Sequence, residues 1–184
     1  MCTTSKQIMG WTLGLLLKAQ NEGNNKLMGG ALTKGGAEGW VQVELDDIYK
    51  TLPNTSWVQR EQYIYVNPLE AVDFLICCSS GALTCIELKV ESLFHTAKLG
   101  RVTMDHKGWQ IVHDDVVQLA ASNRKADFQA ASAYAVAIVW SEEATLGMDH
   151  WLSQRMLAFE REQILVNHDG GQYRVTVYVI EVTG

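Results

Sequence analysis

Three residues suited to phosphoryl chemistry lie on two apolar segments joined by a short turn. Asp73 stands in the first segment, and Glu87 and Lys89 stand two residues apart in the second, with Ser79-Ser80-Gly81 between the segments. Two apolar runs around a Ser/Gly turn predict a β-hairpin. Because side chains alternate across a strand, Glu87 and Lys89 should emerge on one face. Charges held on apolar strands are costly unless they are paired or bind a metal.

The chemistry that these residue types favour is metal-assisted cleavage of a phosphodiester. Two convergent carboxylates offer hard oxygen ligands to Mg²⁺ or Mn²⁺. A neighbouring lysine can orient the attacking water and offset the negative charge that develops in the transition state. Asp73, Glu87 and Lys89 are therefore the candidate catalytic residues of this chain.

Asp73, followed on the next strand by Glu87-Leu88-Lys89, resembles the PD-(D/E)XK nuclease superfamily, which includes restriction enzymes, Holliday-junction resolvases and repair nucleases. Val72 stands where the motif name has proline, a departure that removes no metal ligand. The resemblance covers residues 37–140. It implies a restriction-endonuclease-like core in the order α-β-β-β-α-β, to which this chain adds an N-terminal helix and, after the core, a helix and a β-hairpin.

The resemblance also implies roles for the individual residues. Asp73 and Glu87 would bind Mg²⁺ or Mn²⁺, with the backbone carbonyl of Leu88 as an extra ligand, and Lys89 would orient the water. In the superfamily, the helix before the first strand often adds a carboxylate to the metal site. Glu44 is preferred for that role because it lies well inside the predicted helix. Its alternative is Glu38, an acid of the first turn that a helix N-terminus favours anyway.

A second Asp-x-Lys, Asp105-His106-Lys107, lacks a flanking apolar strand and is interpreted as the polar entry to a helix. Lys98, Arg101 and Lys107 form the basic cluster beside the predicted site and are candidate nucleic-acid contacts. Gln118 is a weaker candidate, because some superfamily members use a glutamine on this helix.

The resemblance favours an endonuclease over an exonuclease, and DNA over RNA as the substrate. The net charge of −6 and the isoelectric point near 5.3 argue against a large sequence-independent phosphate-binding surface. Two alternatives stay open. One is a toxin-like or defence RNase of the same fold. The other is a catalytically silent member of the fold that binds a protein partner through tryptophan-rich surfaces, since the chain has six tryptophans.

Hydrophobic periodicity and turn residues predict the remaining elements. The predicted helices cover residues 4–20, 37–52, 107–123 and 142–161, and the predicted strands cover 57–66 and 133–140, before a hairpin of 164–166 and 173–182. This order predicts an α/β fold with a mixed central sheet flanked by helices. With 184 residues, 47% of them hydrophobic, the chain is predicted to form one domain, 1–184.

The four cysteines, at positions 2, 77, 78 and 85, have no metal-ligand spacing and are interpreted as reduced thiols of an intracellular protein, cytoplasmic or nuclear. The apolar centre of residues 9–17 is short and contains glycines, so it predicts a helix rather than a signal peptide. No apolar run reaches bilayer length, so no membrane partner is expected. A homodimer is left open.

Overall fold

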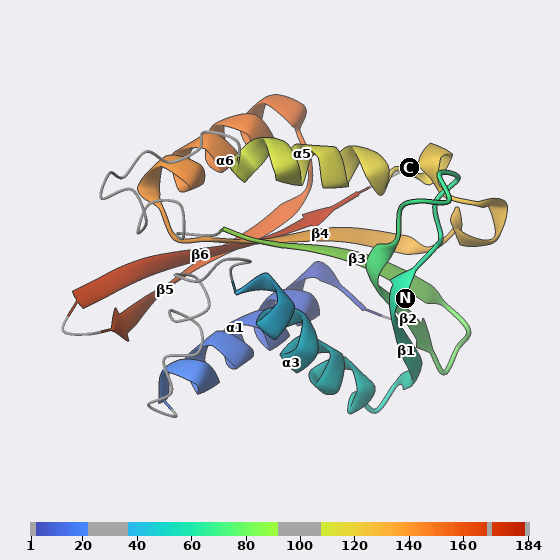
Figure 1. Ribbon diagram of the computed structural model, residues 1–184, viewed down its shortest axis with the longest axis horizontal. Coiled ribbons are helices and arrows are strands. Elements are labelled where there is room, and N and C mark those ends of the chain that lie inside the picture. Colours follow the sequence, from blue (N-terminus) through green and yellow to red (C-terminus); the bar gives the residue numbers. More distant parts are fainter. Residues whose placement is uncertain (1–2, 22–36, 92–107, 169–170, 183–184) are drawn as a thin grey trace.

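The protein, seen in a computed structural model, is an α/β structure in which a mixed six-stranded sheet lies between two layers of helices (Figure 1). The structure describes residues 3–21, 37–91, 108–168 and 171–182. The predicted α/β class, with a mixed sheet and helices on both faces, is confirmed. Within the described residues, no helix is long and apolar enough to cross a bilayer.

The sheet has the strand order β1-β2-β3-β4-β6-β5. Its strands are β1 (Thr55–Gln62), β2 (Val72–Cys78), β3 (Leu83–Val90), β4 (Ser132–Val139), β5 (Phe159–His168) and β6 (Gly171–Glu181). The first three strands form an antiparallel meander, and β4 lies parallel to β3. The C-terminal hairpin then adds β6 and β5 antiparallel to β4 and to each other.

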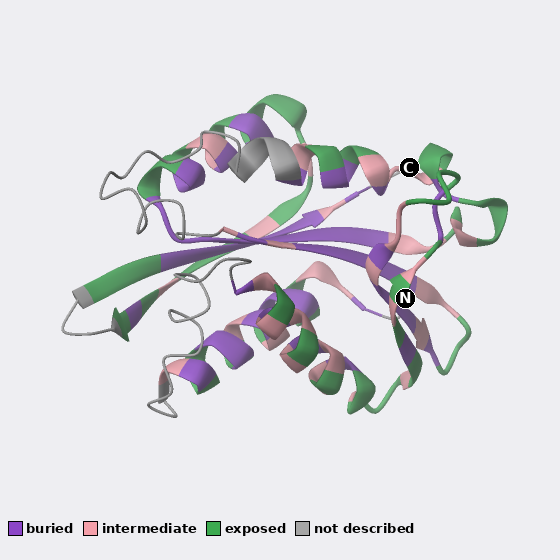
Figure 2. Ribbon diagram, in the orientation of Figure 1, coloured by how far each residue is buried: buried purple, intermediate pink, exposed green. Residues whose placement is uncertain are grey.

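Among the described residues, two helices lie on each face of the sheet (Figure 1). The helices α1 (Ser5–Asn21) and α3 (Glu38–Lys50) lie on one face, and α5 (Gly108–Gln118) and α6 (Glu142–Arg155) lie on the other. Apolar residues of the sheet divide into two buried clusters that match these layers. Figure 2 shows the consequence, because the central strands are buried along most of their length.

Strand β3 has the two-residue alternation that the sequence predicts. Ile86 and Leu88 are fully buried in the cluster under α1 and α3, and Cys85 is buried in the cluster under α5 and α6. Burying a side chain such as Ile or Leu stabilises a fold by roughly 1.5–3 kcal/mol. The apolar contacts of Ile86 and Leu88 therefore hold Glu87 on the face that α5 covers.

Three predicted boundaries are wrong. The predicted strand 57–66 ends at Gln62, because Glu61 has a left-handed backbone (φ 54°) and the chain turns away. The predicted helix 107–123 ends at Gln118 and continues as two 3-10 turns, Ala121–Asn123 and Ala126–Phe128.

The third correction concerns the predicted helix 142–161. Helix α6 ends at Arg155, where Met156 adopts a left-handed backbone (φ 51°). Residues from Phe159 onward are instead strand, because they pair with β6 from Phe159–Ile180 to His168–Gly171. The pairing makes the C-terminal hairpin longer than predicted, and it outweighs the local helical pattern.

The cysteine prediction is correct in part. Cys77 and Cys85 are free thiols, whereas Cys78 is disulfide-bonded. The expectation that all of the cysteines are reduced is therefore wrong for Cys78, and the predicted reducing compartment loses that support. Lys98, Arg101 and Lys107, with the second Asp-x-Lys at 105–107, lie outside the described residues.

Candidate functional site

Asp73 lies where strands β2 and β3 part. The backbone pairing of the two strands runs from Cys77–Leu83 to Phe74–Ile86. Beyond that pair, the N–H of Leu88 donates a hydrogen bond of 2.7 Å to Oδ2 of Asp73. A side-chain carboxylate thus takes the place of a backbone partner. The N–H and C=O of one strand residue point to the same edge, so the Leu88 carbonyl also faces the Asp73 side.

A glutamine of α3 orients the Asp73 carboxylate from the other side. The Gln42 side-chain amide donates to Oδ1 of Asp73 at 2.8 Å, and the Gln42 carbonyl oxygen accepts from the Arg60 guanidinium at 3.1 Å. These contacts join α3, β1 and β2 in one chain of hydrogen bonds. Each oxygen of Asp73 thus accepts one of these hydrogen bonds, and the Asp73 carboxylate also shares a hydrogen bond with the Glu87 carboxyl.

Glu87 is buried, with 5% of its surface exposed, and it accepts a hydrogen bond of 2.5 Å from the hydroxyl of Tyr65. Burial raises the pKa of Glu87 to about 9, and the neighbouring charge of Asp73 adds to the rise, while the Tyr65 hydrogen bond opposes it. Without a bound cation, the Glu87 carboxyl is therefore protonated at neutral pH.

Lys89 lies between two carboxylates that come from different helices. Its ammonium is 3.4 Å from Oε1 of Glu38 and 4.0 Å from Oδ2 of Asp115. Burial by itself lowers the pKa of Lys89, but the charges of Asp115, Glu38 and the two strand carboxylates outweigh it and raise the pKa. Lys89 therefore carries a positive charge throughout the neutral range and acts as a cation and hydrogen-bond donor, not as a base.

Asp115, on α5, is an acid of this cluster that the sequence did not indicate. It is 9% exposed, and burial raises the pKa of Asp115 to about 7, although the Lys89 ammonium lowers it. Its neighbour Asp114 is exposed and pairs with His113. Only the packing of α5 on β3 and β4 decides which of two adjacent acids faces the cluster.

The structure brings Glu38, and not the preferred Glu44, to the cluster. Besides its contact with Lys89, Glu38 accepts a hydrogen bond of 3.3 Å from the N–H of Val90. An α-helix turns about 100° per residue, so Glu44 emerges about 160° around α3 from Gln42, which contacts Asp73. Glu38 reaches the cluster because the N-terminus of α3 is the end that meets β3.

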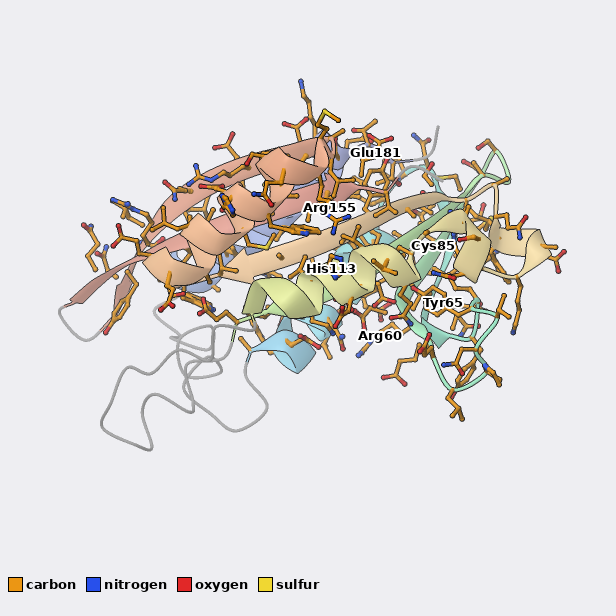
Figure 3. All side chains as sticks on the ribbon, turned by 90° about the horizontal axis from the view of Figure 1, so that it is seen from above. Arg60, Tyr65, Cys85, His113, Arg155 and Glu181 are labelled. Atoms are coloured by element: carbon orange, nitrogen blue, oxygen red, sulfur yellow. The ribbon has the colours of Figure 1, made fainter. Side chains whose placement is uncertain are left out.

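Tyr65 and Gln42 are also residues that sequence reasoning missed. Tyr65 stood in a predicted half-exposed strand, but the break at Glu61 moves it out of β1 and into an isolated bridge with Arg124. Figure 3 labels Tyr65 beside α5 in the view from above. The sequence does contain a clue to Gln42. It lies four residues after Glu38, a spacing that places both side chains on the same face of the helix.

The residues present could hold a hydrated divalent cation. Mg²⁺ usually takes one or two protein carboxylates and completes its shell with waters and substrate phosphate oxygens. Asp73, Glu87 and the Leu88 carbonyl match that donor set. Among the residues that the structure describes, no three His, Cys, Asp or Glu side chains are grouped to hold an ion by themselves. The site thus fits an ion shared with substrate and water, and not a closed structural metal centre.

Gln118 does not belong to this cluster. It lines a cavity of about 530 Å³ between α5 and the segment 66–70, together with residues such as Asn67 and Glu70. Asp115 is the α5 side chain that contacts Lys89, and a role of Gln118 in nucleic-acid binding stays a prediction.

The fold and the site together define an α/β protein with a partly buried cluster of carboxylates and a lysine where two central strands part. Comparison of the chain with protein-family models, with curated proteins and with solved structures finds no match. The functional argument therefore depends on the geometry and electrostatics of the cluster.

Proposed function

We propose that the protein is a nuclease that uses Mg²⁺ or Mn²⁺ to hydrolyse phosphodiester bonds, with a restriction-endonuclease-like core formed by α3, β1, β2, β3, α5 and β4. The single observation that carries this proposal is the pair Asp73 and Glu87. Asp73 lies close enough to Glu87 for its charge and a hydrogen bond between the two carboxyl groups to raise the pKa of Glu87, which together with burial brings it to about 9. Two ionised carboxylates this close are unfavourable, so the pair either holds a proton, as it does without metal, or exchanges that proton for a bound cation.

Each side chain has a role in this proposal. Asp73 and Glu87, with the Leu88 carbonyl, would hold the cation, which activates water and offsets phosphate charge when bound. Gln42 holds the Asp73 carboxylate in place by a hydrogen bond, and Tyr65 does the same for Glu87. Lys89 stays protonated, so it can hold the attacking water and stabilise negative charge on the phosphate. Glu38 and Asp115 position the Lys89 ammonium.

The order of elements supports the same core. The helix α3 precedes three antiparallel strands, α5 follows, and β4 returns parallel to β3. This is the α-β-β-β-α-β order that the sequence resemblance implies, with α1 before it and α6, β5 and β6 after it. DNA is the preferred substrate in the proposal, and RNA cleavage by a toxin-like or defence enzyme of the same fold is the alternative.

The alternative of a catalytically silent, protein-binding member of the fold depended on tryptophan-rich surfaces. Among the tryptophans whose side chains the structure describes, Trp140 and Trp151 are buried and only Trp57 is exposed, at 40%. Most of the tryptophans thus serve the core and its edges rather than a recognition surface.

The test is incubation of purified protein with plasmid DNA, single-stranded DNA and RNA, each with Mg²⁺, Mn²⁺ or EDTA. Cleavage should require a metal ion. Asp73→Asn, Glu87→Gln and Lys89→Ala should each reduce the rate by orders of magnitude while the circular dichroism spectrum is unchanged.

Two variants of the second motif, Asp105→Asn and Lys107→Ala, are the matched controls and should be far milder. Equal losses in both sets would place the site elsewhere. Cleavage in EDTA at the full rate, or no cleavage of any substrate with any metal, would reject the proposed function.

A further inference from the structure

Arg60, on β1, lies next to the carboxylate cluster. Its backbone partner on β2 is Phe74, and Asp73 directly precedes Phe74. Glu87 and Lys89 belong to β3, on the other side of β2. Neighbouring strands are about 4.8 Å apart, so the charged residues form a row across three strands with Arg60 at its β1 end.

One amide group separates the Arg60 guanidinium from the Asp73 carboxylate. The guanidinium donates to the carbonyl oxygen of Gln42 at 3.1 Å, and the amide nitrogen of Gln42 donates to Asp73 at 2.8 Å. Arg60 therefore belongs to the same chain of hydrogen bonds as a proposed metal ligand. Because the Gln42 amide lies between them, the guanidinium is set apart from the point where Asp73 would hold a cation.

Within the described part of the chain, no carboxylate neutralises the charge of Arg60. The guanidinium is always protonated and has five N–H donors, and its partner Gln42 is uncharged. Lys89, in contrast, has two carboxylate partners, Glu38 and Asp115. The charge of Arg60 is therefore available to an anion, whereas the charge of Lys89 is already shared.

The fold itself gains little from a guanidinium at this position. The Nε of Arg60 is buried and has no hydrogen-bond partner among the residues that the structure describes, which is destabilising. The side chain is nevertheless partly exposed, so other atoms of it reach the surface. Polar groups that a fold leaves unsatisfied are expected at functional sites.

We propose that Arg60 binds the phosphate next to the one that is cleaved. A planar guanidinium matches the oxygens of a phosphate and can donate two parallel hydrogen bonds to it. Gln42 lies between the guanidinium and Asp73, so the cation site and Arg60 hold two successive phosphates rather than one. The inference rests on the proposed nuclease function and names its substrate class, which is a polynucleotide strand and not an isolated phosphodiester.

Two substrates distinguish a phosphate contact from a structural role of Arg60. Oligothymidylate has further phosphates beside the cleaved one, whereas bis(p-nitrophenyl) phosphate has none. With Mn²⁺, Arg60→Gln should lower the ratio of kcat/KM for oligothymidylate to kcat/KM for bis(p-nitrophenyl) phosphate by about tenfold or more, as loss of one charge-assisted hydrogen bond implies. Arg60→Lys keeps the charge and should retain most of the ratio. If Arg60 only holds Gln42 and Asp73 in place, both rates fall together, and the unchanged ratio overturns the proposal.

The salt dependence of strand binding tests the same contact without metal or cleavage. The probe is fluorescein-labelled oligothymidylate in EDTA, and its binding is followed by fluorescence anisotropy at increasing KCl. Each phosphate contact with a single strand contributes about 0.7 to the slope of log affinity against log salt concentration. Arg60→Gln should therefore make the slope shallower by about 0.7, and Arg60→Lys should keep it.

Arg155→Gln is the matched control, because it removes an exposed arginine at the end of α6 (Figure 3). It should keep the slope and the ratio of the wild type. Arg60→Met is the second variant if circular dichroism shows that Arg60→Gln does not fold. An unchanged slope in the Arg60 variant, an equal change in Arg155→Gln, or no saturable binding by the wild type would overturn the proposal.

The two proposals fail separately. If Arg60→Gln makes the slope shallower but no substrate is cleaved with any metal, the phosphate contact stands and the nuclease function is wrong. If metal-dependent cleavage occurs but Arg60→Gln changes neither the slope nor the ratio, the nuclease function stands and the phosphate contact is wrong.

Discussion

The hydroxyl of Tyr65 donates a hydrogen bond of 2.5 Å to Oε1 of Glu87, which joins a residue just beyond the broken end of β1 to the centre of β3. The contact opposes the rise in the pKa of Glu87 that burial and Asp73 cause. Metal binding needs the ionised carboxylate, so Tyr65 makes the site available to a cation at lower pH.

Tyr65→Phe should therefore weaken metal binding at neutral pH. Without the hydroxyl, the pKa of Glu87 rises above about 9, so the increase in melting temperature that Mg²⁺ produces should shrink at pH 7 and recover only at a pH above that at which the wild type recovers. Thermal scans with Mg²⁺ or EDTA across this range measure the effect. Tyr63→Phe is the control, because Tyr63 is exposed on the same segment. The same profile for both variants would assign Tyr65 a packing role only.

The metal-free protein should lose stability as the pH rises. Folding raises the pKa of Asp115 from 3.8 to about 7 and that of Glu87 from 4.5 to about 9. A raised pKa means that the folded state binds the proton more tightly, so this stability is full below about pH 4 and is lost progressively up to about pH 9.

Urea unfolding in EDTA between pH 5 and pH 9 measures this decline. Glu87→Gln should flatten the part above pH 7, because the amide does not ionise, and Glu162→Gln, at an exposed acid on β5, should follow the wild type. If the wild-type stability instead rises over the same pH range, the pKa of Glu87 is not raised in the folded protein.

Asp73→Asn should abolish the thermal response to divalent cations. A cation at one hundred times its Kd stabilises the native state by roughly 2.7 kcal/mol, which corresponds to about 5–10 °C for a domain of this size. The amide also cannot accept from both Gln42 and the Leu88 N–H in the present arrangement, so the metal-free variant should melt slightly lower. Differential scanning fluorimetry with and without Mn²⁺ measures both effects. The control is Asp127→Asn, on an exposed turn, which should keep the full response to the cation. If Asp73→Asn also keeps the full response, Asp73 has only a structural role.

Glu38→Gln should lower cleavage activity by about tenfold or more, because Lys89 loses the nearer of its two charged partners. Glu44→Gln is the matched control on the same helix and should retain nearly full activity. Steady-state rates on the substrate identified in the cleavage assay decide between them. Loss of activity in Glu44→Gln alone would restore the original preference for Glu44. A small loss of stability in Glu38→Gln, of about 0.3–1 kcal/mol, is expected from the helix N-terminus as well.

The local pattern of the chain was sufficient to predict the central hairpin and its charged residues. Alternation along β3 is a property of the strand itself, so Glu87 and Lys89 share a face wherever the strand packs. The Ser79-Ser80-Gly81 turn is local in the same sense, and Gly81 has the positive φ of 80° that such a turn uses. The helix before β1, the strand β4 and the mixed α/β class were predicted on the same basis.

The rest of the site depended on contacts that no short stretch of sequence encodes. Tyr65 reaches Glu87 because β1 breaks at Glu61, and Asp115 rather than Asp114 reaches Lys89 because of how α5 packs. Glu38 rather than Glu44 contacts Lys89 because the beginning of α3 lies against the end of β3.

The sequence by itself thus determined which strands carry the charged groups and on which face those groups emerge. The tertiary structure decided which partners surround them, and hence which carboxylate is protonated and which amine stays charged. The physical reason is one of range. Side-chain alternation and turn geometry follow from backbone conformation over a few residues, whereas burial and charge coupling depend on groups brought together from α3, β1, β2, β3 and α5 by packing.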